Sequence, residues 1–131
     1  MNLKRLNLGD LADPKRYTDP INIDGYDSGF LISMLETMLL IRGVEEKLAE
    51  CKKNNLIGGP VHLGAGQEAI AVGVSNNLFS FDRVFGTHRS HPHLLALDPC
   101  VYELFAEILG KDTGLSKGMG GSMHLTKPSS G

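Results

Sequence analysis

The chain has 131 residues, 41% of them hydrophobic and 21% charged, which is sufficient for one soluble globular domain with a modest core. Its formal net charge of −2 gives no general attraction to nucleic acid or anionic lipid, so neither is expected as a partner. No secretion signal is recognisable, and the longest clean apolar run, residues 38–41, is too short to cross a membrane, so a cytoplasmic protein is expected.

The first third of the chain divides into a polar arm and a long helix. Residues 1–26 are polar and interrupted by prolines and a glycine, which predicts an irregular arm. Apolar residues then recur at spacings of three and four, which predicts one amphipathic helix over about residues 27–54, stopped by Gly58-Gly59-Pro60. The predicted apolar face comprises Phe30, Met34, Leu35, Met38, Ile41, Val44, Leu48 and Cys51. The charged residues, Glu45 among them, are expected largely on the other faces.

Shorter elements are predicted in the remainder of the chain. A second helix is expected over residues 66–77, and residues 82–86 form the only convincing strand. A brief helix over residues 92–97 is followed by Asp98-Pro99, which favours an N-cap and first residue of a helix that ends at Gly110. Residues 111–131 contain five glycines and few bulky apolar side chains, a loop composition.

This set of elements predicts an incomplete α/β domain. One strand does not make a sheet, because both of its edges are left without hydrogen-bond partners. We therefore expect residues 27–131 to be the N-terminal portion of a larger domain, mostly helical in this segment. Its remaining strands would lie downstream or on another chain, and the isolated chain would be marginally stable or oligomeric.

The most informative segment is residues 87–93, Thr-His-Arg-Ser-His-Pro-His, at the carboxyl end of the predicted strand. Arg89 offers a fork of donors that suits phosphate or carboxylate, and histidine exchanges protons near neutral pH. His62 lies in a separate glycine-rich loop. We expect functional roles for His62, His88 and His91, and for His93 only that of a hydrogen-bonding loop residue.

Three other interpretations are weaker. Gly64-Ala65-Gly66 matches the start of a dinucleotide-binding pattern, but no clear strand precedes it. The histidines could form a zinc site, yet no cysteine or carboxylate is placed to help and Arg89 would repel the ion, so no metal site is expected. Residues 117–122 look like a phosphate cradle but lack the P-loop ending, which favours a flexible loop.

Three segments stand in order: residues 59–69 (Gly-Pro-Val-His-Leu-Gly-Ala-Gly-Gln-Glu-Ala), residues 87–91 (Thr-His-Arg-Ser-His) and residues 118–124 (Gly-Met-Gly-Gly-Ser-Met-His). Together with the helix segment 42–46, this set resembles the N-terminal part of the alpha subunit of thiamin-diphosphate-dependent 2-oxo acid dehydrogenases. That group includes the pyruvate, branched-chain 2-oxo acid and acetoin dehydrogenases. The resemblance extends over about residues 28–126.

The resemblance implies roles for individual residues. Arg89 matches the arginine that contacts the cofactor diphosphate, and His88 stands beside it where many pyruvate-type members have tyrosine. Thr-His-Arg is more similar to the acetoin-type branch. His62 matches a histidine near the reactive carbon of the cofactor, and His91 is implied to do similar catalytic work. Gln67 and Glu68 are implied to hold their loop in place.

The resemblance also implies what the chain would work with. The expected cofactor is thiamin diphosphate with magnesium, whose Gly-Asp-Gly and asparagine ligands are not in this chain. The expected partners are a beta subunit, in a heterotetramer, and a lipoyl-bearing acyltransferase that receives the acyl unit. As an isolated chain it would be inactive. A non-catalytic truncated interaction module is the alternative from a different class, and a dinucleotide-binding domain is a further one.

Overall fold

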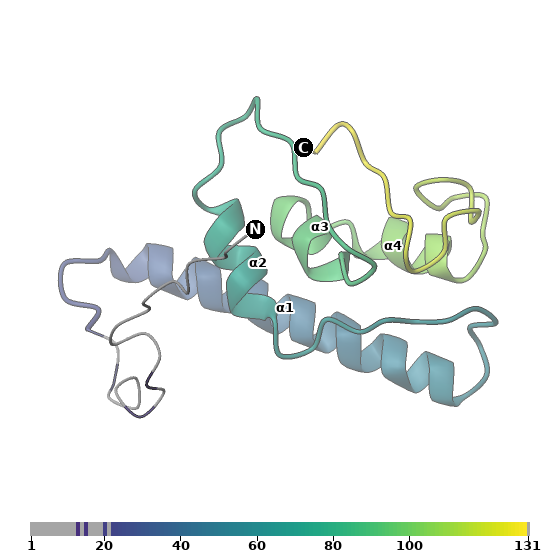
Figure 1. The fold of residues 1–131 in the computed structure, drawn as a ribbon, viewed down its shortest axis with the longest axis horizontal. Coiled ribbons are helices and arrows are strands. Elements are labelled where there is room, and N and C mark those ends of the chain that lie inside the picture. Colours follow the sequence, from purple (N-terminus) through teal and green to yellow (C-terminus); the bar gives the residue numbers. More distant parts are fainter. Residues whose placement is uncertain (1–12, 14, 16–19, 21, 131) are drawn as a thin grey trace, which may run out of the picture.

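The computed structural model describes residues 13, 15, 20 and 22–130 of the chain, so most of the predicted irregular arm lies outside it. The described residues form four helices joined by loops (Figure 1). These are α1 (Ser28–Lys53), α2 (Glu68–Ser75), α3 (His91–Leu97) and α4 (Val101–Ile108). None of these helices combines the length and the apolar character needed to span a membrane.

Helix α1 confirms the long amphipathic helix that the sequence predicts. Asp27 caps its start, where the carboxylate accepts a backbone N–H of the first turn at 2.8 Å. Asn55 ends it in a left-handed conformation with φ of 58°, and the Leu56 N–H donates to the Cys51 carbonyl at 3.0 Å. The helix therefore stops before the Gly58-Gly59-Pro60 run that was expected to end it.

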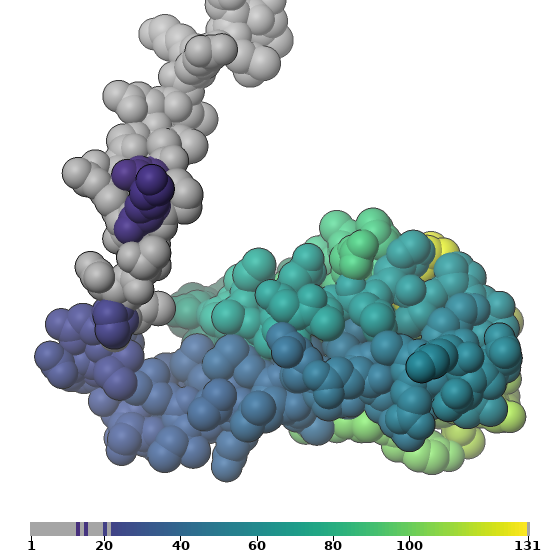
Figure 2. All heavy atoms as spheres, turned by 90° about the horizontal axis from the view of Figure 1, so that it is seen from below, coloured from purple at the N-terminus to yellow at the C-terminus, as the bar shows by residue number. Residues whose placement is uncertain are grey.

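The two halves of α1 have different surroundings. Its second half buries Ile41, Val44 and Leu48 in the core, whereas Leu35 and Leu39 in the first half are 51% and 61% exposed. In Figure 1 the first half extends past the end of α2, and Figure 2 shows α1 running along one face of the molecule. The apolar stripe predicted from the sequence is therefore fully buried only in its second half; in the first half Met34 and Met38 pack partly against the core, whereas Phe30 and Leu35 stay exposed.

The core lies where α1, α2 and α3 contact one another and where α4 closes one side. Its buried apolar residues are Ile41, Val44, Leu48, Cys51, Ile57, Val72, Leu95, Leu104 and Ile108. Each large side chain of this kind contributes roughly 1.5–3 kcal/mol when fully buried. Helix α2 starts later than the predicted residue 66, because Gly66 adopts a φ of 91° in the turn that precedes the helix, and it ends at Ser75 rather than residue 77.

The predicted strand at residues 82–86 is wrong for this structure. Residues 83–86 carry no regular hydrogen-bond pattern, and no strand occurs among the described residues. A strand needs a neighbour to accept and donate its backbone hydrogen bonds, and no described segment supplies one. Phe85 on this segment is 94% exposed. The α/β class that the sequence predicts is therefore not seen in the described residues, whose regular secondary structure consists of helices.

The start of the last helix also differs from the prediction. Asp98 was expected as its N-cap, but α4 begins at Val101 and Asp98 instead ends α3. The Asp98 carboxylate accepts from the Ser130 hydroxyl at 2.6 Å and pairs with Lys127 at 2.9 Å, so it fastens the end of the chain to the helices. The predicted stop at Gly110 is confirmed, with φ of 69°.

Candidate functional site

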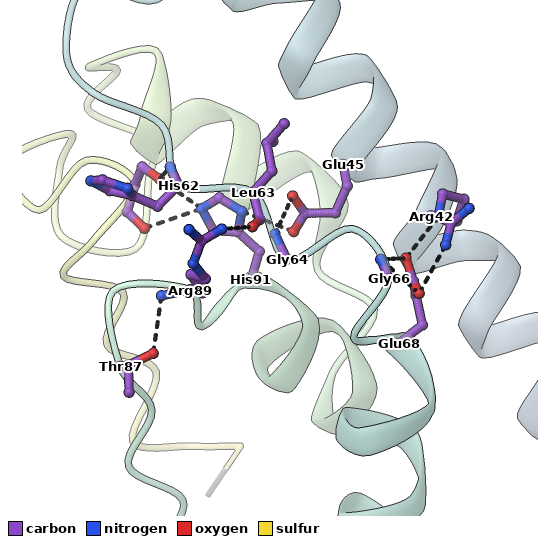
Figure 3. A network of polar contacts seen from close by, with 11 residues as sticks. Arg42, Glu45, His62, Leu63, Gly64, Gly66, Glu68, Thr87, Arg89 and His91 are labelled. Atoms are coloured by element: carbon purple, nitrogen blue, oxygen red, sulfur yellow. Dashed lines mark hydrogen bonds and ion pairs between the residues drawn. The ribbon is translucent and has the colours of Figure 1, made fainter. Parts of the chain in front are cut away.

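The structure brings together three of the four residues singled out from the sequence. The rings of His62 and His88 meet edge to face, with centroids 4.7 Å apart and planes at 76°. The Arg89 guanidinium reaches the same loop, where Nη1 donates to the Leu63 carbonyl at 2.5 Å (Figure 3). His62 is half-buried, and both His88 and Arg89 are exposed.

The local chain explains how Arg89 comes to lie there. Residues 87–90 turn from the extended segment into α3, and the Thr87 hydroxyl accepts the Arg89 N–H at 3.4 Å. Within the described residues Arg89 forms no ion pair with a carboxylate, so its charge faces solvent beside two imidazoles. An exposed guanidinium with neighbouring imidazole groups is suited to an anionic ligand such as a diphosphate.

His91 lies apart from this exposed group, with its side chain wholly buried. Its Nδ1 is 3.0 Å from Oε1 of Glu45, and its Nε2 is 2.8 Å from the hydroxyl and 3.1 Å from the carbonyl of Ser122. Both ring nitrogens are therefore occupied inside the protein (Figure 3). The structure does not bring His91 to the surface with His62.

Glu45 corrects an expectation from the sequence. It was assigned to an exposed face of the first helix, yet its side chain is wholly buried. Burial of a carboxylate is tolerated because both oxygens have partners: Oε2 accepts the Gly64 N–H at 3.0 Å, and Oε1 meets His91. Its position four residues after Ile41 and three before Leu48 was the signal that could have placed it on the buried face.

Ser122 completes a buried Glu45–His91–Ser122 network. Its hydroxyl oxygen also lies 3.4 Å from the His62 backbone N–H. The order carboxylate, imidazole, hydroxyl is that of an acyl-transfer triad. Ser122 is only 5% exposed, however, and its hydroxyl faces other protein groups. The network therefore links buried segments of the protein to one another and does not present the Ser122 hydroxyl to a substrate.

Glu107 organises the glycine-rich loop that was compared with a phosphate cradle. Its buried carboxylate accepts four backbone N–H groups, from Ser116, Gly118, Gly120 and Gly121, at 2.6–3.2 Å. Burial by itself would raise the pKa of Glu107, but these four donors outweigh it and lower the pKa below the ordinary glutamate value. The amides that could have bound phosphate are thus already occupied, and the loop is tied to α4 rather than flexible.

Glu68 holds the turn that follows His62, as expected. It accepts Gly66 N–H at 3.0 Å and pairs with Arg42 of α1 through two nitrogens, at 2.7 and 3.1 Å. The hydrogen bond from Arg42 is the main reason that the pKa of Glu68 falls to about 2; burial opposes the shift and the Gly66 N–H adds to it. Glycine is required at position 64, where a Cβ would lie 2.4 Å from the Pro92 ring.

Two histidines remain outside the site. The Nδ1 atom of His93 is buried and has no hydrogen-bond partner among the described residues, so the expectation that His93 serves as a loop hydrogen-bonder is not met at that atom. His93 borders a cavity of about 390 Å³ between residues 83–87 and 123–130, and the exposed His124 lines the same cavity. Across the described part of the chain, no cluster of three or more His, Cys, Asp or Glu residues could hold a metal ion.

Comparison with known proteins adds an independent line of evidence. The family model described as "Dehydrogenase E1 component" matches residues 36–130. The chain is 48% identical over 92 residues to the alpha subunit of acetoin:2,6-dichlorophenolindophenol oxidoreductase from Bacillus subtilis, which covers 70% of this chain and 28% of that protein. It is 46% identical over 88 residues to the pyruvate dehydrogenase E1 component subunit alpha of Rhizobium meliloti, covering 67% and 25% of the two chains. The corresponding mitochondrial protein of Pisum sativum is 40% identical over 101 residues, covering 77% and 25%.

Proposed function

Because the chain belongs to the dehydrogenase E1 component family, we propose that it forms one wall of the thiamin diphosphate site in an alpha subunit that acts on acetoin or a 2-oxo acid. The chain spans about a quarter of the length of the curated relatives it matches, so the activity, substrates and partners of a whole enzyme are part of this proposal. The observation that carries the proposal is the exposed Arg89 guanidinium beside the paired rings of His62 and His88.

Arg89 and His88 would hold the diphosphate. One guanidinium nitrogen is used to bond the Leu63 carbonyl, which fixes the direction of the side chain and leaves its other donors for a ligand. His88 adds a ring nitrogen at the same exposed surface. When bound, thiamin diphosphate supplies the carbanion chemistry that cleaves a bond next to a carbonyl group. The magnesium ligands would come from outside the described residues.

His62 would be the catalytic residue of this wall. Its ring contacts His88, which precedes Arg89 in the chain, and Arg89 bonds the carbonyl of Leu63, which follows His62. A group bound to Arg89 would therefore lie near His62. From there it can orient the substrate or donate a hydrogen bond to oxygen as negative charge develops. His91, which the resemblance implied as a second catalytic residue, would act through the groups it holds, because its side chain has no exposed surface.

The substrate and the partners follow from the branch of the family that the chain resembles. Thr87-His88-Arg89 is more similar to acetoin-type members, and one similar protein is named for acetoin oxidation. We therefore favour acetoin over a 2-oxo acid. The partners would be a beta subunit and a lipoyl-bearing acyltransferase that accepts the acyl unit.

A chimeric subunit tests this proposal. The matching segment of the Bacillus subtilis alpha subunit is replaced by residues 36–130 of this chain, and acetoin-dependent reduction of 2,6-dichlorophenolindophenol is measured with its native partner present. The chimera is expected to be active. His62→Ala in the chimera is expected to lower kcat by about a hundred-fold or more, the usual effect of losing a positioned acid–base or hydrogen-bonding group.

His124→Ala is the matched control, because His124 is an exposed histidine that lines the separate cavity near residues 83–87. It is expected to change kcat less than two-fold or so. A chimera that assembles normally but has no activity would contradict the proposal and would favour the non-catalytic interaction module.

A further inference from the structure

Three consecutive residues of the loop that carries His62 are each held by a side chain from a distant segment. The His62 N–H faces the Ser122 hydroxyl at 3.4 Å, and the Leu63 carbonyl accepts from Arg89 at 2.5 Å. The Gly64 N–H donates to Glu45 at 3.0 Å. Residues 61–64 have no helix or strand of their own, so these side chains fix the backbone in place of a regular hydrogen-bond ladder.

Two of the three contacts belong to one connected chain of hydrogen bonds. Nδ1 of His91 lies within hydrogen-bond distance of the Glu45 carboxylate, and Nε2 lies within hydrogen-bond distance of both the hydroxyl and the carbonyl oxygen of Ser122. A hydroxyl oxygen has two acceptor lone pairs. The hydroxyl oxygen is then available to accept the His62 N–H. A single buried network therefore ends on the loop at both His62 and Gly64, and its three side chains are at most 5% exposed.

Close packing reinforces the same arrangement. A Cβ at position 64 would lie 2.4 Å from the Pro92 ring and 3.5 Å from Glu45, so the loop lies directly against the start of α3 and the carboxylate. Any shift of the loop would break contacts with α1, α3 and the segment around Ser122 together. From this fixed backbone the ring of His62 reaches the ring of His88, with centroids 4.7 Å apart.

We propose that Glu45 and Ser122 are positioning residues for His62, acting through His91 and through the backbone of residues 62–64. This inference rests on the proposed function, in which His62 faces cofactor and substrate. A displacement on the order of 1 Å at a reacting group is enough to cost about a hundred-fold in rate, so a fixed loop has catalytic value.

The first test uses nuclear magnetic resonance on the full 131-residue chain. Ser122→Ala is expected to speed amide hydrogen exchange at His62 by about ten-fold and to weaken the cross-relaxation between the His62 and His88 rings. Exchange at Leu48 and Leu104, in the helical core, is expected to stay unchanged. Ser116→Ala is the matched control, since it lies in the same glycine-rich segment but outside the network.

Glu45→Gln provides a second variant of the same size. One amide oxygen cannot serve both Gly64 and His91, so exchange at Gly64 is expected to rise by about ten-fold while the helical core again stays protected. Exchange that rises equally at all amides, or unfolding of both variants, would overturn the inference, because the network would then serve only the stability of the fold.

The second test separates positioning from cofactor binding in the chimeric subunit. Ser122→Ala is expected to lower kcat about ten-fold and to leave the Kd for thiamin diphosphate within about two-fold. If the parent chimera is active and Ser122→Ala leaves kcat unchanged, that result contradicts the positioning role but not the proposed function. An inactive parent chimera would contradict the proposed function instead, and the exchange measurements on the full chain would still decide the positioning role.

Discussion

The buried carboxylates are the residues that the sequence placed least well. Glu45 was assigned to an exposed helix face and Glu107 was not singled out, yet neither is exposed at all. A glutamate is buried only when donors surround it, and those donors come from residues 64 and 91 for Glu45 and from residues 116–121 for Glu107. The helical phase of a glutamate can show that it lies on the buried face. Its hydrogen-bond donors are distant in sequence, however, and cannot be identified from local spacing.

Glu107→Gln should be one of the most destabilising conservative changes in the chain. The amide group replaces an acceptor oxygen with a donor that faces backbone N–H groups, so the free energy of unfolding is expected to fall by about 3 kcal/mol. Urea unfolding followed by circular dichroism measures this. Glu103→Gln, a control on the same helix whose side chain is 43% exposed, is expected to cost at most about 1 kcal/mol. Equal losses in the two variants would contradict the role given to Glu107.

The Arg42–Glu68 pair predicts a pH dependence of stability. The pKa of Glu68 is lowered from 4.5 to about 2 on folding, chiefly by the hydrogen bond from Arg42. Because the folded state holds the proton less tightly, the contribution is complete above pH 4.5 and is lost as the pH falls toward about 2. The Arg42 side chain is 46% exposed, so this contribution is expected to be only about 1 kcal/mol.

This contribution is measured by comparing the free energy of unfolding of the native chain and of single variants as the pH is lowered. The difference in unfolding free energy between the native chain and Glu68→Gln is expected to shrink progressively between pH 4.5 and about 2. Glu36→Gln, a change at an exposed carboxylate of α1, is the control and is expected to shift stability by less than about 0.5 kcal/mol. A difference that stays constant over this pH range would contradict the linkage.

At the scale of elements, local pattern predicted helices well and the strand badly. Helix α1 needs only its own periodicity, the Asp27 cap and a left-handed residue at its end, all of which are local. The segment 82–86 contains Val84 and Phe85, which are residue types favoured in strands, but a strand exists only when another segment pairs with it. Likewise Asp98-Pro99 is typical of a helix start, but Asp98 instead lies at the end of α3 and forms an ion pair with Lys127.

Buried and exposed positions of α1 should respond differently to the same truncation. Leu48 is wholly buried, so Leu48→Ala is expected to lower the free energy of unfolding by about 2–5 kcal/mol through lost burial and a cavity. Leu39 is 61% exposed on the same helix, so Leu39→Ala is expected to change it by less than about 0.5 kcal/mol. Thermal and urea unfolding of both variants measures this, and a comparable loss at Leu39 would contradict the exposed position of its side chain.

At the scale of the whole molecule, neither spacing nor composition could bring His62 to His88 and Arg89. Those residues lie in separate loops, and their proximity depends on the network through Glu45, His91 and Ser122. The resemblance to a known family suggested that they share a site, and membership of the dehydrogenase E1 component family is now shown. The interior network that holds them could be described only from three-dimensional contacts.

The central claim is that Arg89 binds the diphosphate of the cofactor, and the Kd for thiamin diphosphate tests it most directly. Calorimetry with magnesium present is carried out on the chimeric subunit that contains residues 36–130. Loss of the charged hydrogen bonds in Arg89→Ala is expected to raise the Kd about ten- to hundred-fold. Arg83→Ala removes an exposed arginine whose guanidinium, among the described residues, bonds the carbonyl of its neighbour Asp82, and this change is expected to leave the Kd within about two-fold. Equal affinity of the Arg89→Ala and parent chimeras would contradict the account.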